Sequence, residues 1–326
     1  MKATAIAPVN NALTKYWGKK DEKLRIPLNS TISVNLSNMV TTTTVEFSNR
    51  YEADIVEVNG KKLTDLETRR VIMHIDRIRT LAHIKHKARI VSAFNFPMSA
   101  GLSSSASGFA ALTVAGAVAA GLTLNEKELT ILARQASGSA CRSIPDGFVE
   151  WVAGVSHETS YARSIFPANH WPLVDIAVIV STDKKEVPTS EGQKLVETSP
   201  FMKTRLARIE SKNKRIKLYI KERNMQKFGE LVEEEAVELH AIMLTSKPSL
   251  IYWTEGTLRL MKLVKKWRSN GLPLYFTINT GQNIHLLCEE KTAAVVTEQI
   301  KQLDFVQQMI VNRISEGTCL SEKHLF

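Results

Sequence analysis

The chain has 326 residues, of which 44% are hydrophobic and 23% charged, and its formal net charge is +10. This composition fits a globular protein with a sizeable core and excludes a disordered chain. Because no apolar run is long enough to span a bilayer and no signal-peptide layout opens the sequence, we expect a cytoplasmic protein. The surplus positive charge favours anionic partners, and because the basic residues are scattered without a nucleic-acid-binding motif, we expect phosphorylated small molecules rather than nucleic acid or membrane.

The first half of the chain mixes strand and helix patterns. Runs rich in β-branched residues predict strands at residues 3–8, 31–37, 40–48, 87–95 and 148–153. Periodic apolar spacing predicts helices at residues 66–82, from about 104 to 121, and from 126 onward, after the helix-capping residue Asn125. Asn59-Gly60 predicts a tight hairpin turn between two short strands.

The second half is richer in helix. It predicts strands at residues 174–180, 274–279, 284–288 and 307–312, and helices at residues 200–222, 225–244, 254–269 and 290–302. The apolar residues of 200–222 form one stripe, so we interpret its many lysines and arginines as a solvated face. Segregated helices and antiparallel strands predict an α+β fold, with a lobe boundary that divides the chain into residues 1–182 and 183–326.

The cysteines and histidines carry no metal-site pattern. Cys141, Cys288 and Cys319 lack the spacing of a zinc site, and their odd number argues against a disulfide framework. His240 and His285 are interpreted as ordinary packed or surface residues.

The most informative segment is the serine- and glycine-rich run at residues 97–108, PMSAGLSSSASG, which follows a predicted strand and opens a predicted helix. Small residues let the backbone approach a ligand closely. The free N–H groups at a helix start, together with the helix dipole, form an anion site. Composition alone leaves a plain helix-capping turn as the alternative.

Two further segments carry unusual polar patterns. Residues 7–21 read APVNNALTKYWGKKD, a predicted strand followed by a lysine-bearing loop that could also be a hairpin with solvated charges. Residues 136–143 read ASGSACRS and are followed by GFVEW at 147–151. Ser137, Ser139 and Arg142 form a donor-rich turn, and a guanidinium suits a carboxylate or a phosphate. Taken alone, Arg142 is equally well explained as a structural ion pair.

Together these segments resemble the mevalonate diphosphate/phosphomevalonate decarboxylase family of the GHMP kinase superfamily. Residues 97–106 match the GHMP phosphate loop at every fixed position and are not a Walker A loop, because no Gly-Lys-Ser/Thr follows. Lys15-Tyr16-Trp17-Gly18-Lys19 and the Gly138-Ser139-Ala140-Cys141-Arg142-Ser143 run resemble motifs of the decarboxylases. The resemblance extends through residues 183–187 and 277–283.

The resemblance implies a fold and a reaction. The fold is a GHMP kinase fold, with an N-terminal lobe like ribosomal protein S5 domain 2 and a ferredoxin-like C-terminal lobe. Members of the family bind ATP and Mg²⁺ and phosphorylate the tertiary 3-hydroxyl of a mevalonate 5-phosphate or 5-diphosphate. Phosphate and carbon dioxide then leave, giving isopentenyl phosphate or isopentenyl diphosphate. A homodimer is expected from the family alone.

The resemblance also assigns roles to individual residues. It places Lys15 at the 3-hydroxyl and Arg142 on the substrate carboxylate. The other substrate-binding residues that it implies are Tyr16, Lys19, Ser137, Ser139, Thr189 and Ser190. The nucleotide-binding residues that it implies are Gly101, Ser103, Ser104, Ser105 and Ser107 at the phosphates, with Ser105 also reaching Mg²⁺, and Asn95 near the adenine.

One departure from the family pattern concerns the chemistry directly. The family motif Asp-Ala-Gly-Pro-Asn reads Asn279-Thr280-Gly281-Gln282-Asn283 in this chain, so an amide replaces the carboxylate expected at the 3-hydroxyl. An amide cannot take a proton at neutral pH. An engineered isosteric replacement, a natural enzyme that stops at the 3-phosphate or uses another base, and a catalytically dead binding protein are all open. Asp146, where the family has glycine, is a second departure.

The substrate is predicted from a missing arginine. Diphosphate-using relatives often carry arginine where this chain has Ser190, and its absence removes a strong phosphate donor. We therefore expect an ATP-dependent decarboxylase of mevalonate 5-phosphate, impaired by Asn279. Mevalonate 5-diphosphate decarboxylase, a GHMP kinase that does not decarboxylate, and a nucleotide- or metabolite-binding pseudoenzyme are the alternatives.

Overall fold

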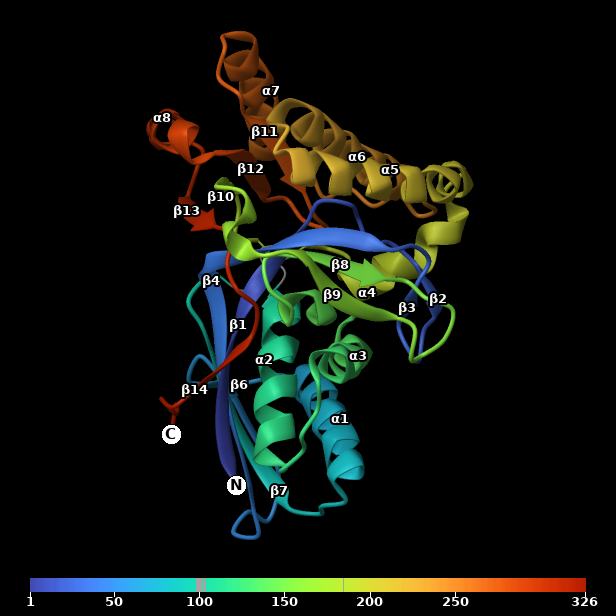
Figure 1. Cartoon of the computed structure of the whole chain (residues 1–326), viewed down its shortest axis with the longest axis vertical. Helices are drawn as coiled ribbons and strands as arrows, with labels where there is room; N and C mark the ends of the chain where they lie inside the picture. The colour runs from blue at the N-terminus through green and yellow to red at the C-terminus, as the bar shows by residue number, and fades with distance from the viewer. Residues whose placement is uncertain (98–101, 103, 184) are drawn as a thin grey trace.

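The Thr- and Val-rich runs near the N-terminus form two long neighbouring strands at the centre of a large sheet. In the computed structural model, which describes residues 1–97, 102, 104–183 and 185–326, β1 (Lys2–Ala12) pairs antiparallel with β4 (Thr31–Ser48). The two strands form one wall of the lower lobe, and the second lobe lies above it in the same view (Figure 1).

The large sheet has eight strands in the order β14-β1-β4-β7-β5-β6, with β8 paired to β4 and β9. Its remaining strands are β5 (Ile55–Val58), β6 (Lys61–Lys62), β7 (Lys87–Phe94), β8 (Phe148–Val152), β9 (Tyr161–Phe166) and β14 (Cys319–Ser321). All pairs are antiparallel except β5 with β7. Because β4 is long, β8 and β7 pair with successive parts of it along the same edge.

Three helices lie together on one face of this sheet (Figure 1). They are α1 (Asp65–Ala82), α2 (Ser104–Ala119) and α3 (Glu126–Ala136), and the short 3₁₀ helix η1 (Gly138–Ser143) follows α3. Helix α2 is rich in alanine and almost wholly buried, and it lies between α1 and the strands within one hydrophobic cluster. Burial of this helix fixes the position of its N-terminus, where the phosphate-loop pattern ends.

The second lobe is built on a four-stranded antiparallel sheet in the order β11-β12-β10-β13. Its strands are β10 (Leu173–Ile179), β11 (Tyr275–Ile278), β12 (Ile284–Glu289) and β13 (Gln308–Arg313). Its helices are α4 (Thr189–Gly192), α5 (Met202–Glu222), α6 (Met225–Thr245), α7 (Glu255–Ser269) and α8 (Glu290–Lys301). A small hairpin of β2 (Lys19–Asp21) and β3 (Ile26–Pro27), and the 3₁₀ helices η2 (Ala168–His170) and η3 (Gln193–Thr198), complete the fold.

Most of the predicted elements are confirmed, and so is the α+β class. Asn59 and Gly60 both have positive φ, 48° and 71°, as the predicted hairpin turn requires. Asn125 caps α3 through a reciprocal bond pair with Glu128. The segments predicted as two strands, 31–37 and 40–48, form the single strand β4, and β9 and β14 were not predicted. A hairpin was the alternative for the lysine-bearing loop, and part of that loop forms β2 of the β2–β3 hairpin.

The interpretation of every basic residue in 200–222 as a solvated face is wrong. Arg205 is 1% exposed and Lys212 is 0% exposed, and both form ion pairs with Glu235 of α6, which is itself fully buried. Their spacing in the sequence already indicates burial, because Arg205, Ile209 and Lys212 lie four and three residues apart and so share the buried face of α5. Burial of cations on an apolar stripe requires a buried anion opposite it.

The predicted division at residues 182 and 183 stays a prediction. Strand β10, which precedes it, belongs to the second sheet, and β14, which follows it, pairs with β1 of the first sheet. No helix among the described residues is long and apolar enough to cross a bilayer.

Candidate active site

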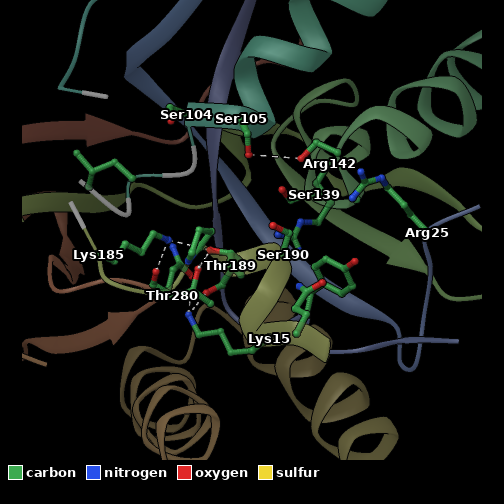
Figure 2. A pocket seen from close by; sticks show the side chains of 18 of the residues that line it. Lys15, Arg25, Ser104, Ser105, Ser139, Arg142, Lys185, Thr189, Ser190 and Thr280 are labelled. Carbon is green, nitrogen blue, oxygen red and sulfur yellow. Dashed lines mark hydrogen bonds between the residues drawn. The ribbon is translucent and has the colours of Figure 1, made fainter. Parts of the chain in front are cut away.

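A cavity of about 290 Å³ is lined by segments from both lobes. Most of the described residues that line it come from the loop after β1, the start of α2, η1, α4 with its preceding loop, and the loop after β11, and single residues come from the end of β1, the β2–β3 turn, α1, the loop before α2, the residue before η1, η3 and α6. Figure 2 shows Ser104 and Ser105 at the top of this pocket and Lys15 and Thr280 towards the bottom. The cavity therefore brings together the segments that the sequence motifs singled out.

The lining is strongly cationic. It contains five basic side chains and, among its described residues, no aspartate or glutamate; the basic residues are Lys15, Arg25, Arg70, Arg142 and Lys185. Converging cations without carboxylates favour a ligand that carries several negative charges. A phosphorylated acid fits this requirement.

Lys15 lines the cavity next to Asn279 and is held from several sides. Its Nζ donates to Ala12 O and Thr277 Oγ1, both at 2.6 Å, and to Asn279 Oδ1 at 3.0 Å. Burial lowers the pKa of Lys15 to about 7, although the carboxylate of Glu235 opposes the shift. The ammonium has three N–H groups and faces three oxygens, which fixes its position.

The backbone of Lys15 is held by the buried ion pairs of α5 and α6. Its N–H donates to Glu235 Oε2 at 3.1 Å, and its carbonyl accepts from Arg205 at 2.8 Å. Sequence reasoning missed these positioning residues because it treated the charges of α5 as solvated. The buried ion pairs thus connect the helical layer of the second lobe to the candidate catalytic lysine.

Asn279 follows β11 and is held by both its side chain and its backbone. Its Nδ2 donates to Asn11 Oδ1 at 3.0 Å, while its Oδ1 accepts from Lys15. His240 Nε2 donates to the carbonyl of Asn279 at 2.9 Å. Burial lowers the pKa of His240 to about 3, so its ring is neutral and serves as a positioning donor. The interpretation of His240 as a packed residue holds, but this contact was not foreseen.

Arg142, on η1, is a buried cation without a carboxylate partner among the described residues. It is 4% exposed, and its guanidinium donates to Asn10 Oδ1 at 3.1 Å and Thr31 Oγ1 at 2.7 Å. Burial lowers the pKa of Arg142 to about 10. An unpaired buried charge is costly, so the site is suited to receive an anion from the ligand. The structure thus disfavours the alternative of a structural ion pair.

The wall formed by α2 and η1 presents hydroxyl groups to the cavity. Ser104, Ser105, Ser137 and Ser139 all line it, and the one hydroxyl–hydroxyl contact between them joins Ser105 and Ser137 at a long 3.4 Å. Tyr16 also lines it, and its buried hydroxyl has no partner among the described residues. These groups remain available for oxygen atoms of a ligand.

The loop that leads into α4 supplies the remaining wall. Lys185 Nζ donates to Thr189 Oγ1 at 2.8 Å and to Thr280 O at 2.7 Å, which joins this loop to the loop after β11. Burial lowers the pKa of Lys185 to about 8. Thr189 and Ser190, which stay predicted substrate-binding residues, both line the cavity. The second lobe therefore contributes a cation and two hydroxyls to the site.

Three predicted site residues line neither this cavity nor the smaller pocket that adjoins it. Lys19 pairs with Glu22 at 2.9 Å, Asn95 is exposed and bonds to the backbone at residues 38 and 40, and Ser107 is fully buried with its hydroxyl on Thr41 at 2.7 Å. Ser107 lies one helical turn inside α2, so its side chain points into the core. Gly101 and Ser103 lie outside the described residues.

A second, more apolar pocket of about 160 Å³ adjoins the first and shares Arg70, Ser104 and Ser105 with it. Its other walls are mainly hydrophobic and include Val56, Val58, Leu63, Val71, Phe94 and Phe109. A flat apolar ring joined to phosphates suits this pair of pockets, because the phosphates would lie at the shared serines. Sequence reasoning did not find this pocket because its residues come from four separate elements.

Arg25 and Arg70 are further cavity residues that the motifs did not include. Arg25 lies in the turn between β2 and β3, and its Nε donates to Gln135 O at 3.0 Å. Arg70 is one of several basic residues on α1, with nothing in its spacing to mark it. Asp146, the second departure from the family pattern, has a structural role: its carboxylate accepts from Gly317 N at 2.7 Å and it does not line the cavity.

Two family models match the chain in sequence. Residues 7–162 match the diphosphomevalonate decarboxylase-like N-terminal domain, and residues 176–323 match the mevalonate 5-diphosphate decarboxylase C-terminal domain. A diphosphomevalonate decarboxylase of Candida albicans is 37% identical over 88% of this chain and 84% of the relative. The human diphosphomevalonate decarboxylase is 33% identical over 89% of this chain and 78% of the relative.

Solved structures of the same kind superpose closely. The mevalonate diphosphate decarboxylase from Staphylococcus aureus has a TM-score of 0.93 and 37% identity, covering 98% of both chains. A structure described as MDDEF in complex with MVAPP, AMPPCP and magnesium has a TM-score of 0.93 and 36% identity, covering 99% of both chains. The likeness confirms the expected GHMP kinase fold and its two-lobe arrangement.

The prediction of mevalonate 5-phosphate as substrate is wrong. The relatives and the structural neighbours are named as diphosphomevalonate decarboxylases, which was the alternative. Ser190 in place of arginine removes one phosphate donor from the site. Arg25, Arg70 and Lys185 line the cavity as well, so the absence of an arginine at position 190 leaves ample charge for a diphosphate.

Proposed function

Because the chain belongs to the diphosphomevalonate decarboxylase family, we propose that it converts mevalonate 5-diphosphate to isopentenyl diphosphate, with release of phosphate and carbon dioxide. The proposal is supported mainly by the cavity, in which five basic side chains lie near the serine-lined start of α2. One of the five, Arg142, is buried and has no carboxylate partner among the described residues. A substrate with a carboxylate at one end and a diphosphate at the other complements this lining.

The residue roles follow from the positions of the groups. Arg142 binds the substrate carboxylate, because it is a buried cavity guanidinium whose only described hydrogen-bond partners are the neutral side chains of Asn10 and Thr31. Lys15 lies at the tertiary oxygen, where charge changes during the reaction. Tyr16, Ser137 and Ser139 orient the substrate, and Lys185, Thr189, Ser190 and Arg25 surround its phosphates. Lys19 and Asn95 remain predicted ligand contacts that the cavity does not support.

ATP and Mg²⁺ fit the serine-lined wall. Ser104 and Ser105, at the N-terminus of α2, would hold the nucleotide phosphates, and the adjoining apolar pocket would hold the base. No group of three or more metal-binding His, Cys, Asp or Glu side chains exists in the described part of the chain. Mg²⁺ would therefore be held by phosphate oxygens and the Ser105 hydroxyl, where it supplies neutralisation of phosphate charge.

The chemistry of the chain's own residues divides into two steps. Phosphoryl transfer to the tertiary oxygen depends on alignment and on neutralised charge, which the serines and lysines supply. Elimination depends on stabilising the departing phosphate, and Lys15 lies where this charge develops. The bond between C2 and the carboxylate carbon held on Arg142 breaks, and its electron pair forms the new double bond as carbon dioxide leaves. Asn279 offers no proton acceptor, so we propose that it slows the first step.

The test is release of labelled carbon dioxide from mevalonate 5-diphosphate labelled at C1, with MgATP, by the unaltered chain. We expect carbon dioxide and phosphate in equal amounts. A stable 3-phosphorylated product without gas would instead identify a kinase, and tight ligand binding without any turnover would identify a binding protein. Light scattering after gel filtration tests the proposed homodimer, and fractionation of the source cells tests the proposed cytoplasmic location.

A further inference from the structure

A chain of hydrogen bonds at the reacting end of the cavity has a direction that is fixed from both ends. At its inner end, Asp175 is 0% exposed and accepts from Asn11 Nδ2 at 2.5 Å and from His285 Nδ1 at 2.8 Å. A carboxylate only accepts hydrogen bonds, so Asn11 must turn its amide nitrogen towards Asp175. The oxygen of Asn11 therefore faces Asn279.

Position 279 completes the chain. Asn279 Nδ2 donates to Asn11 Oδ1 at 3.0 Å, and Asn279 Oδ1 accepts from Lys15 Nζ at 3.0 Å. A lysine ammonium only donates, so this neighbour requires an acceptor, while Asn11 requires a donor. An amide meets both requirements. His240 adds a third constraint by donating to the backbone carbonyl of the same residue.

An aspartate at position 279 would not fit this chain. Its oxygen would face Asn11 Oδ1, and if Asn11 turned over, its oxygen would instead face Asp175. Either orientation places two acceptors against each other in a buried site, which leaves one without a donor. Asn279 is therefore part of a buried hydrogen-bond network, and the surrounding side chains are arranged for an amide and not for the carboxylate of an aspartate.

The same end of the cavity has no other described carboxylate to replace it. The lining contains no aspartate or glutamate among its described residues, and the nearest buried carboxylates, Asp175 and Glu235, lie behind Asn11 and behind the backbone of Lys15. Losing a positioned base lowers a rate by roughly 10²–10⁴-fold. Phosphorylation of a tertiary hydroxyl needs such a proton acceptor, whereas elimination from a phosphorylated carbon does not.

We propose that the preferred substrate is a mevalonate ester that already carries phosphate on O3 as well as on O5, and that the cavity eliminates this phosphate without a nucleotide. The inference deepens the proposed function and rests on it. The C3–O bond breaks, and phosphate leaves with the electron pair and takes a proton from water. The C1–C2 bond breaks, its pair forms the C2=C3 double bond, and carbon dioxide departs.

The groups that this elimination needs are all present. Lys15 and the serines of α2 lie where the leaving phosphate gathers charge, and Arg142 holds the carboxylate in place. The additional phosphate also explains why the lining is so rich in cations and lacks carboxylates. A separate ATP-dependent phosphorylation of the tertiary hydroxyl must supply such a substrate.

The experiment compares two reactions of the unaltered chain. One uses synthetic mevalonate phosphorylated on O3 and O5, labelled at C1, without nucleotide; the other uses labelled mevalonate 5-diphosphate with MgATP. We expect the first to release carbon dioxide at least about 100-fold faster. If only the second releases gas, or both proceed at equal rates, the inference is overturned while the proposed function stands. If neither releases gas from folded protein, the proposed function itself fails.

A matched pair of variants tests the hydrogen-bond argument independently. Asp175→Asn combined with Asn279→Asp reverses both hydrogen bonds of Asn11, which then donates to position 279 and accepts from position 175, while Lys15 still donates to position 279 and His285 to position 175. We expect this double variant to gain at least about 10-fold in ATP-dependent gas release, because it places a base at O3. Asn279→Asp alone should gain less. Equal gains in both variants would show that the direction of the chain does not matter.

Discussion

The two sides of the cavity differ in how far their polar groups are satisfied by the protein. On the side formed by α2 and η1, the serine hydroxyls that line the cavity share one long contact, the Tyr16 hydroxyl has no described partner, and the Arg142 guanidinium has neutral partners but no described carboxylate. On the side formed by β1 and β11, Lys15 and Asn279 have their donors and acceptors matched within the protein. We call the first the receiving side, because its polar groups are available to a ligand. We call the second the matched side, because its polar groups already bond to one another within the protein.

This difference gives each side a separate experimental signature. Removing a group from the receiving side should weaken binding and leave the fold intact, because its partner belongs to the ligand. Removing a group from the matched side should also disturb stability, because buried partners lose their hydrogen bonds. The predictions below test that separation, from the largest expected effect to the smallest.

Lys15→Met should have the largest effect. It removes the cation at the tertiary oxygen, and we expect gas release to fall by about 10³-fold, as for loss of a group that stabilises developing charge. Lys185→Met is the matched control, because Lys185 lies in the same cavity on a loop that bonds to Thr189 and Thr280. Steady-state assays of gas release should show a clearly smaller loss of rate for Lys185→Met. Equal losses would contradict the assignment of Lys15 to the tertiary oxygen.

Arg142→Ala should weaken substrate binding by about 10- to 100-fold, the equivalent of about 1.5–3 kcal/mol for a hydrogen bond to a charged group. Nucleotide affinity should stay unchanged, since Arg142 does not line the adjoining apolar pocket. Calorimetry with mevalonate 5-diphosphate and with an ATP analogue measures both. Parallel loss of both affinities would contradict the assignment of Arg142 to the carboxylate.

Asn279→Asp should lower the free energy of unfolding by about 1–3 kcal/mol, because one buried acceptor loses its donor. The variant that also carries Asp175→Asn should recover most of that loss. Thermal unfolding of the three proteins provides the comparison. If the single variant is as stable as the unaltered chain, Asn11 can satisfy both neighbours and the matched side is less rigid than we infer.

Over the first pH unit above neutrality, the pH dependence of stability should show the smallest effect, about 1 kcal/mol. The pKa of Lys15 is lowered from 10.5 to about 7 by burial, so between these values the unfolded chain binds more protons than the folded chain. Stability should therefore rise with pH in this window. Lys15→Met lacks the group, so denaturant titrations should show the unaltered chain gaining stability relative to this variant from pH 7 upwards. A constant difference would contradict the shift.

The sequence predicted the elements and the receiving side better than the matched side. Ser104, Ser105, Ser137 and Arg142 stand in contiguous motifs, so local patterns were sufficient to place them in one cavity. The matched side joins Asn11, Asp175 and Asn279, which lie far apart along the chain. Single polar residues within buried strands have no periodicity that reveals their partners.

The sequence analysis misjudged three kinds of residue, each for a different physical reason. Arg205 and Lys212 look like surface residues until Glu235 is found opposite them. Arg25 reaches the cavity from a hairpin turn with no motif. Ser107 belongs to the motif, but the helix turns it into the core, where it bonds to Thr41. Motif membership therefore predicts the segment that lines a site, whereas the helical phase decides which side chains reach it.

The central claim is that the cavity receives the substrate with its carboxylate on Arg142 and its tertiary oxygen at Lys15. A crystal structure with bound mevalonate 5-diphosphate tests this most directly. The account predicts carboxylate oxygens within hydrogen-bond distance of the Arg142 guanidinium and O3 next to Lys15 and Asn279. A substrate bound in the reverse direction, with its diphosphate on Arg142, would contradict it.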